Sequence, residues 1–215
     1  MHLPAFPFPE KDAITIQQLL NHSSGLGDYM EHDDYKRTMP GIDTIASILP
    51  LIYAQKPQFP PGERFGYSNS GMVLLGAIIE KTSGLAYPDY LQQRIFQPAG
   101  MTDSQLAQEH DVLANRAIGY TMTPDRGYRA NVREIMPASA DGGLHATATD
   151  LLRFDQALDG NTLLVAESRQ RMFTPVGPAP FYASGWFTKR VDGHLAVGHG
   201  GGAPGINAEY RRYPD

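Results

Sequence analysis

The stretch PGERFGYSNSGMVLLGAIIEKT, residues 61–82, joins a proline–glycine turn to the most strongly predicted helix of the chain. From residue 70 to residue 82, apolar side chains occur on nearly all sides of a helical period, so this helix should be buried. Gly84 follows as a helix stop signal. Tyr67 and Asn69 therefore lie between a turn and a buried helix, which would hold both side chains rigidly at the mouth of a cleft.

Weaker helical patterns occur on both sides of this stretch. They cover residues 12–21, 43–52, 88–96, 147–158 and 165–173. Pro50 should kink or shorten the second of these helices. Residues 100–140 contain many loop-forming residues and show no clear period.

The last part of the chain changes from helical to strand-like character. Residues 182–190 and 195–199 flank Asp192-Gly193, which is a strong signal for a two-residue hairpin turn, and residues 207–213 could add a third strand. The expected fold class is α+β, with a mostly helical region over residues 1–175. Residues 176–215 should form part of an antiparallel sheet.

Composition excludes several classes of function. The 215 residues carry a net charge of −5, and no basic run exceeds Arg211-Arg212, so nucleic-acid binding has no electrostatic footprint. No apolar run approaches the length of a membrane helix, and residues 1–9 lack the features of a signal peptide. The chain has no cysteine, and its seven histidines include no H-x-x-x-H pair, so we expect neither a metal site nor a cofactor.

Two segments contain residues suited to catalysis. Tyr67 could act as a general base only if its pKa fell well below about 10, and Asn69 could hold a substrate carbonyl or orient a lysine. His199 lies at the predicted junction of a strand with a glycine-rich turn. The glycines at 201 and 202 would let a ligand approach the backbone. Taken singly, a packing tyrosine, a helix cap and a structural histidine are the commoner roles.

Four segments in this order resemble the serine hydrolases grouped with class C β-lactamases and penicillin-binding proteins. The family's L-L-x-H-x-S-G-L is matched by residues 19–26, and its P-G-x-x-F-x-Y-S-N by residues 61–69. Its G-G-L-x-S-T-A-x-D-L is matched by residues 142–151, with Ala146 where serine is usual, and its H-x-G-G-x-x-G by residues 199–205. Each motif alone is weak, but the ordered set is specific.

The resemblance implies a serine β-lactamase-like fold and assigns roles by position. Tyr67 resembles the catalytic tyrosine that exchanges a proton with the nucleophile, and Asn69 resembles the asparagine beside the substrate's scissile group. His199 resembles the strand residue that faces the substrate. Gly201 and Gly202 resemble the strand glycines that contact the substrate, and the N–H of Gly202 would supply one donor of the oxyanion hole.

The family's nucleophile motif, S-x-x-K, is absent from this sequence. The residues three positions before Lys11, Lys36, Lys56, Lys81 and Lys189 are Phe8, Asp33, Tyr53, Ile78 and Trp186. The absence of this motif and the abrupt start and end of the chain indicate the same thing. We therefore expect a piece of the family fold that is truncated at both ends. Losing the nucleophile of a triad-type enzyme has cost on the order of 10⁶-fold in rate, so we expect the chain alone to be nearly inert.

Several readings stay open. The complete protein of which this chain is a piece could hydrolyse an ester, an amide or a β-lactam. Histidine rather than lysine at position 199 favours an esterase or a peptidase. Alternatively, the chain is a natural non-catalytic relative that uses the cleft for binding or as a scaffold. A periplasmic or secreted location would fit the family, and an unpaired sheet edge could support self-association.

Overall fold

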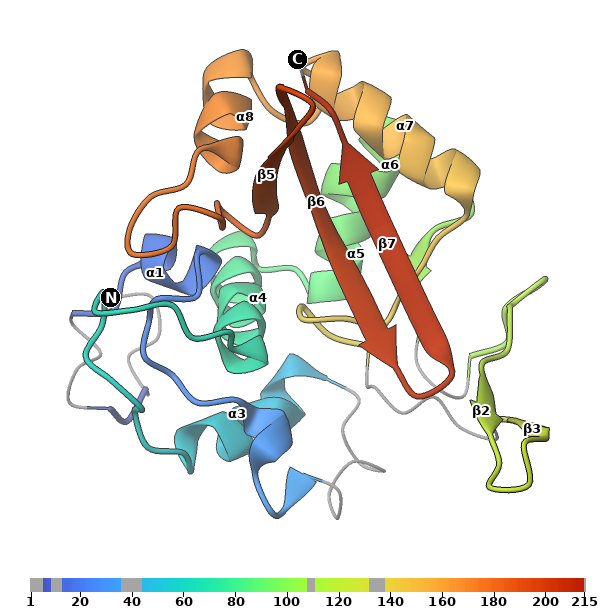
Figure 1. The fold of residues 1–215 in the computed structure, drawn as a ribbon, viewed down its shortest axis with the longest axis horizontal. Helices are drawn as coiled ribbons and strands as arrows, with labels where there is room; N and C mark the ends of the chain where they lie inside the picture. Colours follow the sequence, from blue (N-terminus) through green and yellow to red (C-terminus); the bar gives the residue numbers. More distant parts are fainter. Residues whose placement is uncertain (1–5, 9–12, 36–43, 108–110, 132–137, 215) are drawn as a thin grey trace.

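The computed structural model describes residues 6–8, 13–35, 44–107, 111–131 and 138–214. Helices and short strands come first along the chain, and a three-stranded antiparallel sheet comes last (Figure 1). Helices α7 and α8 lie beside this sheet, and α4 packs against α1, α3 and α5. The α+β class expected from the sequence is confirmed. The division of the chain at residue 175 stays a prediction.

Helix α4, Asn69–Ser83, forms the centre of the helical part. Val73 and Leu74 are buried, as the apolar pattern predicted, and Gly84 ends the helix in the left-handed conformation. The N-cap is Ser68, whose hydroxyl oxygen accepts a hydrogen bond from the Gly71 amide at 3.2 Å. Asn69 is the first helical residue, so its side chain is not used for capping.

The remaining helices have the following bounds: α1 Ile16–Leu20, the 3₁₀ turn Tyr29–Glu31, α3 Ile45–Tyr53, α5 Tyr87–Leu91, the π-helical turn Gln92–Phe96, α6 Gln97–Ala99, α7 Ala148–Asp159 and α8 Ala166–Phe173. The predicted starts at Asp12 and Asp43 lie outside the described residues. Thr15 and Thr44 cap α1 and α3 through capping boxes. Pro50 lies inside α3, which continues past it to Tyr53.

The sheet has the order β5-β6-β7, formed by Phe187–Val191, His194–Ala203 and Ile206–Arg212. Asp192 and Gly193 both have positive φ, at 51° and 87°, so the predicted two-residue hairpin turn is confirmed. Within the described residues β5 and β7 are the sheet edges. Self-association through such an edge stays a prediction.

The glycine-rich run is strand rather than turn, which corrects the sequence interpretation. Residues 200–202 pair with residues 207–209 of β7, and the chain reverses only at Pro204-Gly205. Gly205 has φ 75°, so it supplies the conformation that this reversal needs. The ladder continues because glycine still offers an N–H and a C=O to the neighbouring strand.

Four short strands were not predicted. They pair as β1 with β4 and β2 with β3, and their bounds are Gln105–Leu106, Leu144–His145, Tyr120–Met122 and Tyr128–Ala130. Strands of two or three residues are too short to show an alternating pattern in the sequence.

Two segments far apart in sequence are joined by three backbone hydrogen bonds. The amides of Gln58, Gly62 and Gly66 donate to the carbonyls of Gly25, Ser23 and His22, at 2.8, 2.7 and 2.8 Å. Gly25 has φ +79°, and a Cβ there would lie 2.0 Å from the carbonyl oxygen of Phe59. Only glycine fits this close approach.

Two hydrophobic clusters stabilise the described part. The larger lies beneath α1, α3 and α4, and the smaller joins α7 and α8 to β6. The smaller cluster includes Leu158, Phe173 and Val197, all of which are buried. None of the helices in the described ranges has the length and apolar character needed to span a bilayer.

Replacing Gly25 with alanine tests the joined loops. We expect Gly25→Ala to lower the free energy of unfolding by roughly 2–4 kcal/mol, because left-handed strain and the clash with the Phe59 carbonyl add together. Gly84→Ala is the matched control, since φ is +72° there but nothing lies within 4 Å of the new Cβ. It should cost about 1–2 kcal/mol from strain alone. Equal losses in urea denaturation would contradict the role of the Gly25 contact.

Candidate active site

His22 lies at the junction of the two joined loops. It follows α1 with φ 54°, a left-handed conformation that is uncommon for a residue with a side chain, and it is only 1% exposed. Its Nδ1 accepts a hydrogen bond from the Ser68 amide at 3.2 Å. The imidazole therefore fixes the start of α4.

Tyr182 connects His22 to His199. The Tyr182 Oη lies 3.0 Å from His22 Nε2 and 3.1 Å from His199 Nε2, and the Tyr182 side chain is 1% exposed. His199 Nδ1 lies 2.6 Å from the carbonyl oxygen of Gly200. Both nitrogens of His199 are thus engaged by groups of the chain itself.

Tyr67 packs over the hydrogen-bonded row of His22, Tyr182 and His199. The centroid of its ring lies 4.1 Å from that of His22 and 6.1 Å from that of His199. Tyr67 is 44% exposed, and its ring rests on His22. The structure therefore brings Tyr67 and His199 to one site, although the sequence separates them by more than 130 residues.

Asn69 lies at the start of α4 and is held by Asp28. The Asn69 backbone N–H and Nδ2 both donate to Asp28 Oδ2, at 3.0 and 2.7 Å, and Nδ2 also lies 3.7 Å from the sulfur of Met30. The amide nitrogen is occupied in this way. Its carbonyl oxygen is the atom left for a ligand, and an acceptor suits a cationic donor such as an ammonium group.

Gly201 and Gly202 lie on a part of β6 that has only one neighbouring strand. The pairing of β5 with β6 stops at Phe187 and Gly198, whereas β6 pairs with β7 as far as Ala203. Both glycines are exposed, and a Cβ at Gly201 would meet nothing within 4 Å in the described chain. Crowding within the chain therefore does not explain the glycine at 201, and the open strand edge can accept a ligand backbone.

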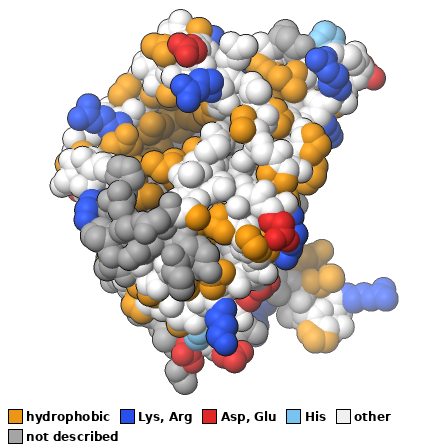
Figure 2. Space-filling view, turned by 90° about the vertical axis from the view of Figure 1, so that its left-hand side faces the viewer, with side chains coloured by type: hydrophobic (Ala, Val, Ile, Leu, Met, Phe, Trp, Pro, Cys, Tyr) orange, Lys and Arg blue, Asp and Glu red, His pale blue; other side chains and the backbone are white. Residues whose placement is uncertain are grey.

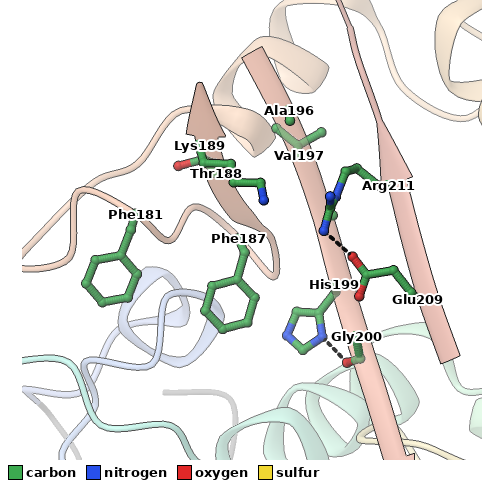
Figure 3. A pocket seen from close by; sticks show the side chains of 11 residues that line it. Phe181, Phe187, Thr188, Lys189, Ala196, Val197, His199, Gly200, Glu209 and Arg211 are labelled. Atoms are coloured by element: carbon green, nitrogen blue, oxygen red, sulfur yellow. Dashed lines mark hydrogen bonds and ion pairs between the residues drawn. The ribbon is translucent and has the colours of Figure 1, made fainter. Parts of the chain in front are cut away.

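A cavity of about 360 Å³ adjoins His199 on the sheet. Figure 3 shows Phe181 and Phe187 side by side at one wall, with His199 and the Glu209–Arg211 ion pair opposite. Tyr67 and Asn69 do not line this cavity. The cavity and the Tyr67 phenol therefore lie near His199 as separate features.

Burial sets the protonation of the site. Burial, followed by the nearby His199, lowers the pKa of His22 to about 4, so its imidazole is neutral at pH 7. Burial, followed by the carboxylates of Asp141 and Asp28, raises the pKa of Tyr67 above its ordinary value. Burial also raises the pKa of Asp141 to about 6, against the hydrogen bond it accepts from Tyr29.

Two negative charges act on Tyr67, those of Asp141 and Asp28. They favour a neutral or cationic group beside the phenol over an anion. No grouping of three or more metal-ligating side chains occurs in the part of the chain that the structure describes. On the described part of the face in Figure 2, positive and negative side chains are spread in small groups, without a continuous basic patch.

Known proteins are similar to this chain in sequence and in fold. The family model described as Beta-lactamase matches residues 1–215. Penicillin-binding protein 4* of Bacillus subtilis is 33% identical over 99% of this chain and 51% of its own length. A D-aminopeptidase of Cereibacter sphaeroides is 29% identical over 96% of this chain and 40% of its own length. The chain thus spans about half the length, or less, of these curated relatives.

A solved structure is also similar to this chain. The crystal structure of a penicillin-binding protein from Bacillus halodurans has a TM-score of 0.86 and 32% sequence identity, over 98% of this chain and 69% of that one. Its likeness to the chain supports the serine β-lactamase-like fold expected from the motifs.

Sequence reasoning missed two parts of the site. His22 lies within the recognised motif of residues 19–26 but was given no catalytic role. Tyr182 carried no signal, because its partner His22 is 160 residues away and nothing in a sequence reports such a contact. Both nitrogens of His199 are engaged within the chain, and its role toward a substrate stays a prediction.

The depressed pKa of His22 predicts how stability depends on pH. The unfolded chain binds a proton at His22 below about 6.5, whereas the folded chain does so only below about 4. Between these values the unfolded state holds more protons, so stability rises with pH and about 3 kcal/mol is lost as the pH falls from 7 to 4.

The variant His22→Gln isolates this effect, because glutamine does not titrate and its amide can still donate toward Tyr182. The raised pKa of Asp141 gives an opposite slope below about pH 6, but it is present in both proteins and cancels in the difference. Urea denaturation from pH 4 to 7 measures both proteins. Identical pH slopes would show that His22 is not the group responsible.

Proposed function

The chain belongs to the beta-lactamase family, and on this premise we propose that it carries part of the active site of a serine hydrolase that cleaves an ester or amide through an acyl-enzyme. In this proposal Tyr67 transfers the proton, and Asn69 holds the cation that assists it. His199 borders the substrate, Gly202 presents its backbone N–H to it, and Gly201 contacts it.

One observation supports this proposal most. The exposed phenol of Tyr67 and the ring of His199 lie 6.1 Å apart, next to the unpaired edge of the glycine strand. A reacting carbonyl placed along that edge would lie beside both a proton-transferring group and backbone donors. This combination is what acyl transfer requires.

The electrostatics of Tyr67 indicate what the site lacks. A phenol with pKa about 10 is ionised to only about 0.1% at pH 7, and the surroundings of Tyr67 raise its pKa further. The 215 residues contain no S-x-x-K motif. We therefore infer that proton transfer by Tyr67 needs a lysine ammonium beside it and a serine hydroxyl in front of it, both supplied from outside these residues.

The substrate class follows from the relatives and from the site. One relative is a D-aminopeptidase and another a penicillin-binding protein, so an amide or ester of small size is the proposed substrate. Histidine at 199 has both nitrogens engaged within the chain, so we infer that it does not donate a ring N–H to the carboxylate of a β-lactam. We therefore favour an esterase or peptidase activity over β-lactam hydrolysis.

A second candidate is a non-catalytic relative that binds a ligand in the same cleft. The absence of S-x-x-K from the sequence is the observation that favours it. In this case no form of the protein would form an acyl-enzyme.

A fluorophosphonate probe separates the two candidates. We expect the 215-residue chain to remain unlabelled and to hydrolyse p-nitrophenyl acetate on the order of 10⁶-fold more slowly than a form extended upstream by its own coding sequence. The extended form should be labelled at one serine. Absence of labelling in both forms would reject the hydrolase proposal and favour the non-catalytic relative.

Tyr67→Phe tests the proton-transfer role in the extended form. We expect the rate of ester hydrolysis to fall by roughly 10²- to 10⁴-fold, because the phenol is the proposed proton carrier. The free energy of unfolding should change by less than about 0.5 kcal/mol, since Tyr67 is 44% exposed and phenylalanine keeps its ring. Tyr128→Phe, which also removes an exposed phenol, is the control and should leave the rate unchanged. Equal rates in both variants would contradict the assignment.

A further inference from the structure

We propose that Tyr182 is a positioning residue that joins His22 and His199 while the two histidines hold opposite neutral tautomers, which leaves His199 no nitrogen for proton exchange with a substrate. The proposal rests on the function proposed above only in treating Tyr67 and His199 as parts of an active site. The hydrogen bonds that carry it are properties of the folded chain and exist without substrate.

The first end of the row is a group that can only donate. The backbone amide of Ser68 points at His22 Nδ1, at 3.2 Å, so Nδ1 must be the unprotonated, accepting nitrogen. A neutral imidazole then carries its proton on Nε2. This N–H faces the Tyr182 oxygen at 3.0 Å and donates to it.

The other end of the row is a group that can only accept. The carbonyl oxygen of Gly200 lies 2.6 Å from His199 Nδ1, so this nitrogen must carry a proton. In a neutral His199 the remaining nitrogen, Nε2, is then an acceptor. It faces the same Tyr182 oxygen at 3.1 Å.

The Tyr182 hydroxyl joins the two ends without conflict. Its oxygen accepts from His22, and its one proton is donated to His199, so every donor in the row meets an acceptor. Tyr182 is only 1% exposed, and its ring centroid lies 5.4 Å from that of Phe65 and 4.7 Å from that of Phe187, so the hydroxyl is held in place by packing. A reversed His22 tautomer would place its Nδ1–H against the buried Ser68 N–H, and a reversed His199 tautomer would place its unprotonated Nδ1 against the Gly200 carbonyl oxygen.

The same row controls the position of Tyr67. The Tyr67 ring rests on His22, with the two centroids 4.1 Å apart and the planes inclined by 35°. Tyr182 fixes the His22 ring through its hydroxyl and touches it with its own ring, at a centroid distance of 4.9 Å. A change at Tyr182 therefore reaches Tyr67 through His22, although no contact between Tyr182 and the substrate is involved.

The consequence for His199 is specific. A histidine whose two nitrogens are bonded to Tyr182 and Gly200 can present its ring face and its C–H groups to a substrate, but it cannot donate or take a proton while these bonds persist. Proton transfer at the site then falls to Tyr67.

Nuclear magnetic resonance of the 215-residue chain labelled with ¹⁵N-histidine tests the tautomers at pH 7.5. His22 should show the Nε2–H form. His199 should show the Nδ1–H form, which is the less common tautomer of free imidazole in water. Assignment uses His22→Gln and His199→Gln. A protonated His199, or the Nε2–H form at His199, would overturn the proposal.

Tyr182→Phe tests whether the hydroxyl positions the two imidazoles. Without it, His22 Nε2–H loses its acceptor and His199 Nε2 loses its donor, so the imidazole resonances of both histidines and the ring resonances of Tyr67 should shift. Tyr210→Phe is the matched control, because it removes a hydroxyl that bonds to Asp155 and leaves the row intact. Unchanged His22, His199 and Tyr67 resonances in Tyr182→Phe would refute the proposal. Should this variant not fold, a through-space contact between the Tyr182 hydroxyl proton and the His199 ring protons decides the question in the unaltered chain.

Activity separates this proposal from the proposed function. In the extended form, Tyr182→Phe should lower kcat on the order of 10- to 100-fold with little change in KM, because positioning and not binding is lost. Correct tautomers without probe labelling would leave the row in place and reject the hydrolase. Probe labelling together with the Nε2–H form at His199 would support the hydrolase and reject the proposed role of Tyr182.

Discussion

Three backbone hydrogen bonds between residues 22–25 and 58–66 hold the two loops on which the site is built. They place His22 beneath Tyr67 and bring the Ser68 amide to the imidazole, so the start of α4 is fixed from two directions. Gly25 makes this possible because only a glycine can lie so close to the Phe59 carbonyl with a left-handed backbone. The left-handed conformation of His22 belongs to the same turn and points its side chain into the protein.

Two imidazoles and a phenol are joined end to end between a backbone amide and a backbone carbonyl. In the proposed tautomers these groups are neutral, so that no charge has to be desolvated. The described residues near them offer aromatic rings, among them Phe65 and Phe187, and no compensating charge is among these two partners. Burial, followed by the neighbouring His199, depresses the pKa of His22 in these surroundings.

Two carboxylates, those of Asp28 and Asp141, act on Tyr67. Asp28 holds the amide of Asn69, and Asp141 accepts a hydrogen bond from the Tyr29 hydroxyl, so both have structural partners. Their negative charge opposes ionisation of Tyr67, and a cation placed between them and the phenol would reverse that effect. In the proposed function the chain supplies the scaffold of a hydrolytic site, and the activating charge is still to be supplied.

Local signals in the sequence were sufficient for the elements with strong patterns and for the family. The apolar run of α4, the Asp192-Gly193 turn and the four ordered motifs each depend on residues that are close in the chain, so a single sequence shows them. The roles of Tyr67, Asn69, His199, Gly201 and Gly202 came from the resemblance, and they remain proposals. Only the tertiary structure decided that residues 200–202 are strand and that Tyr182 bridges His22 and His199. The physical reason is that strand pairing and buried hydrogen bonds join groups separated by many residues, and their geometry exists only once the chain has folded.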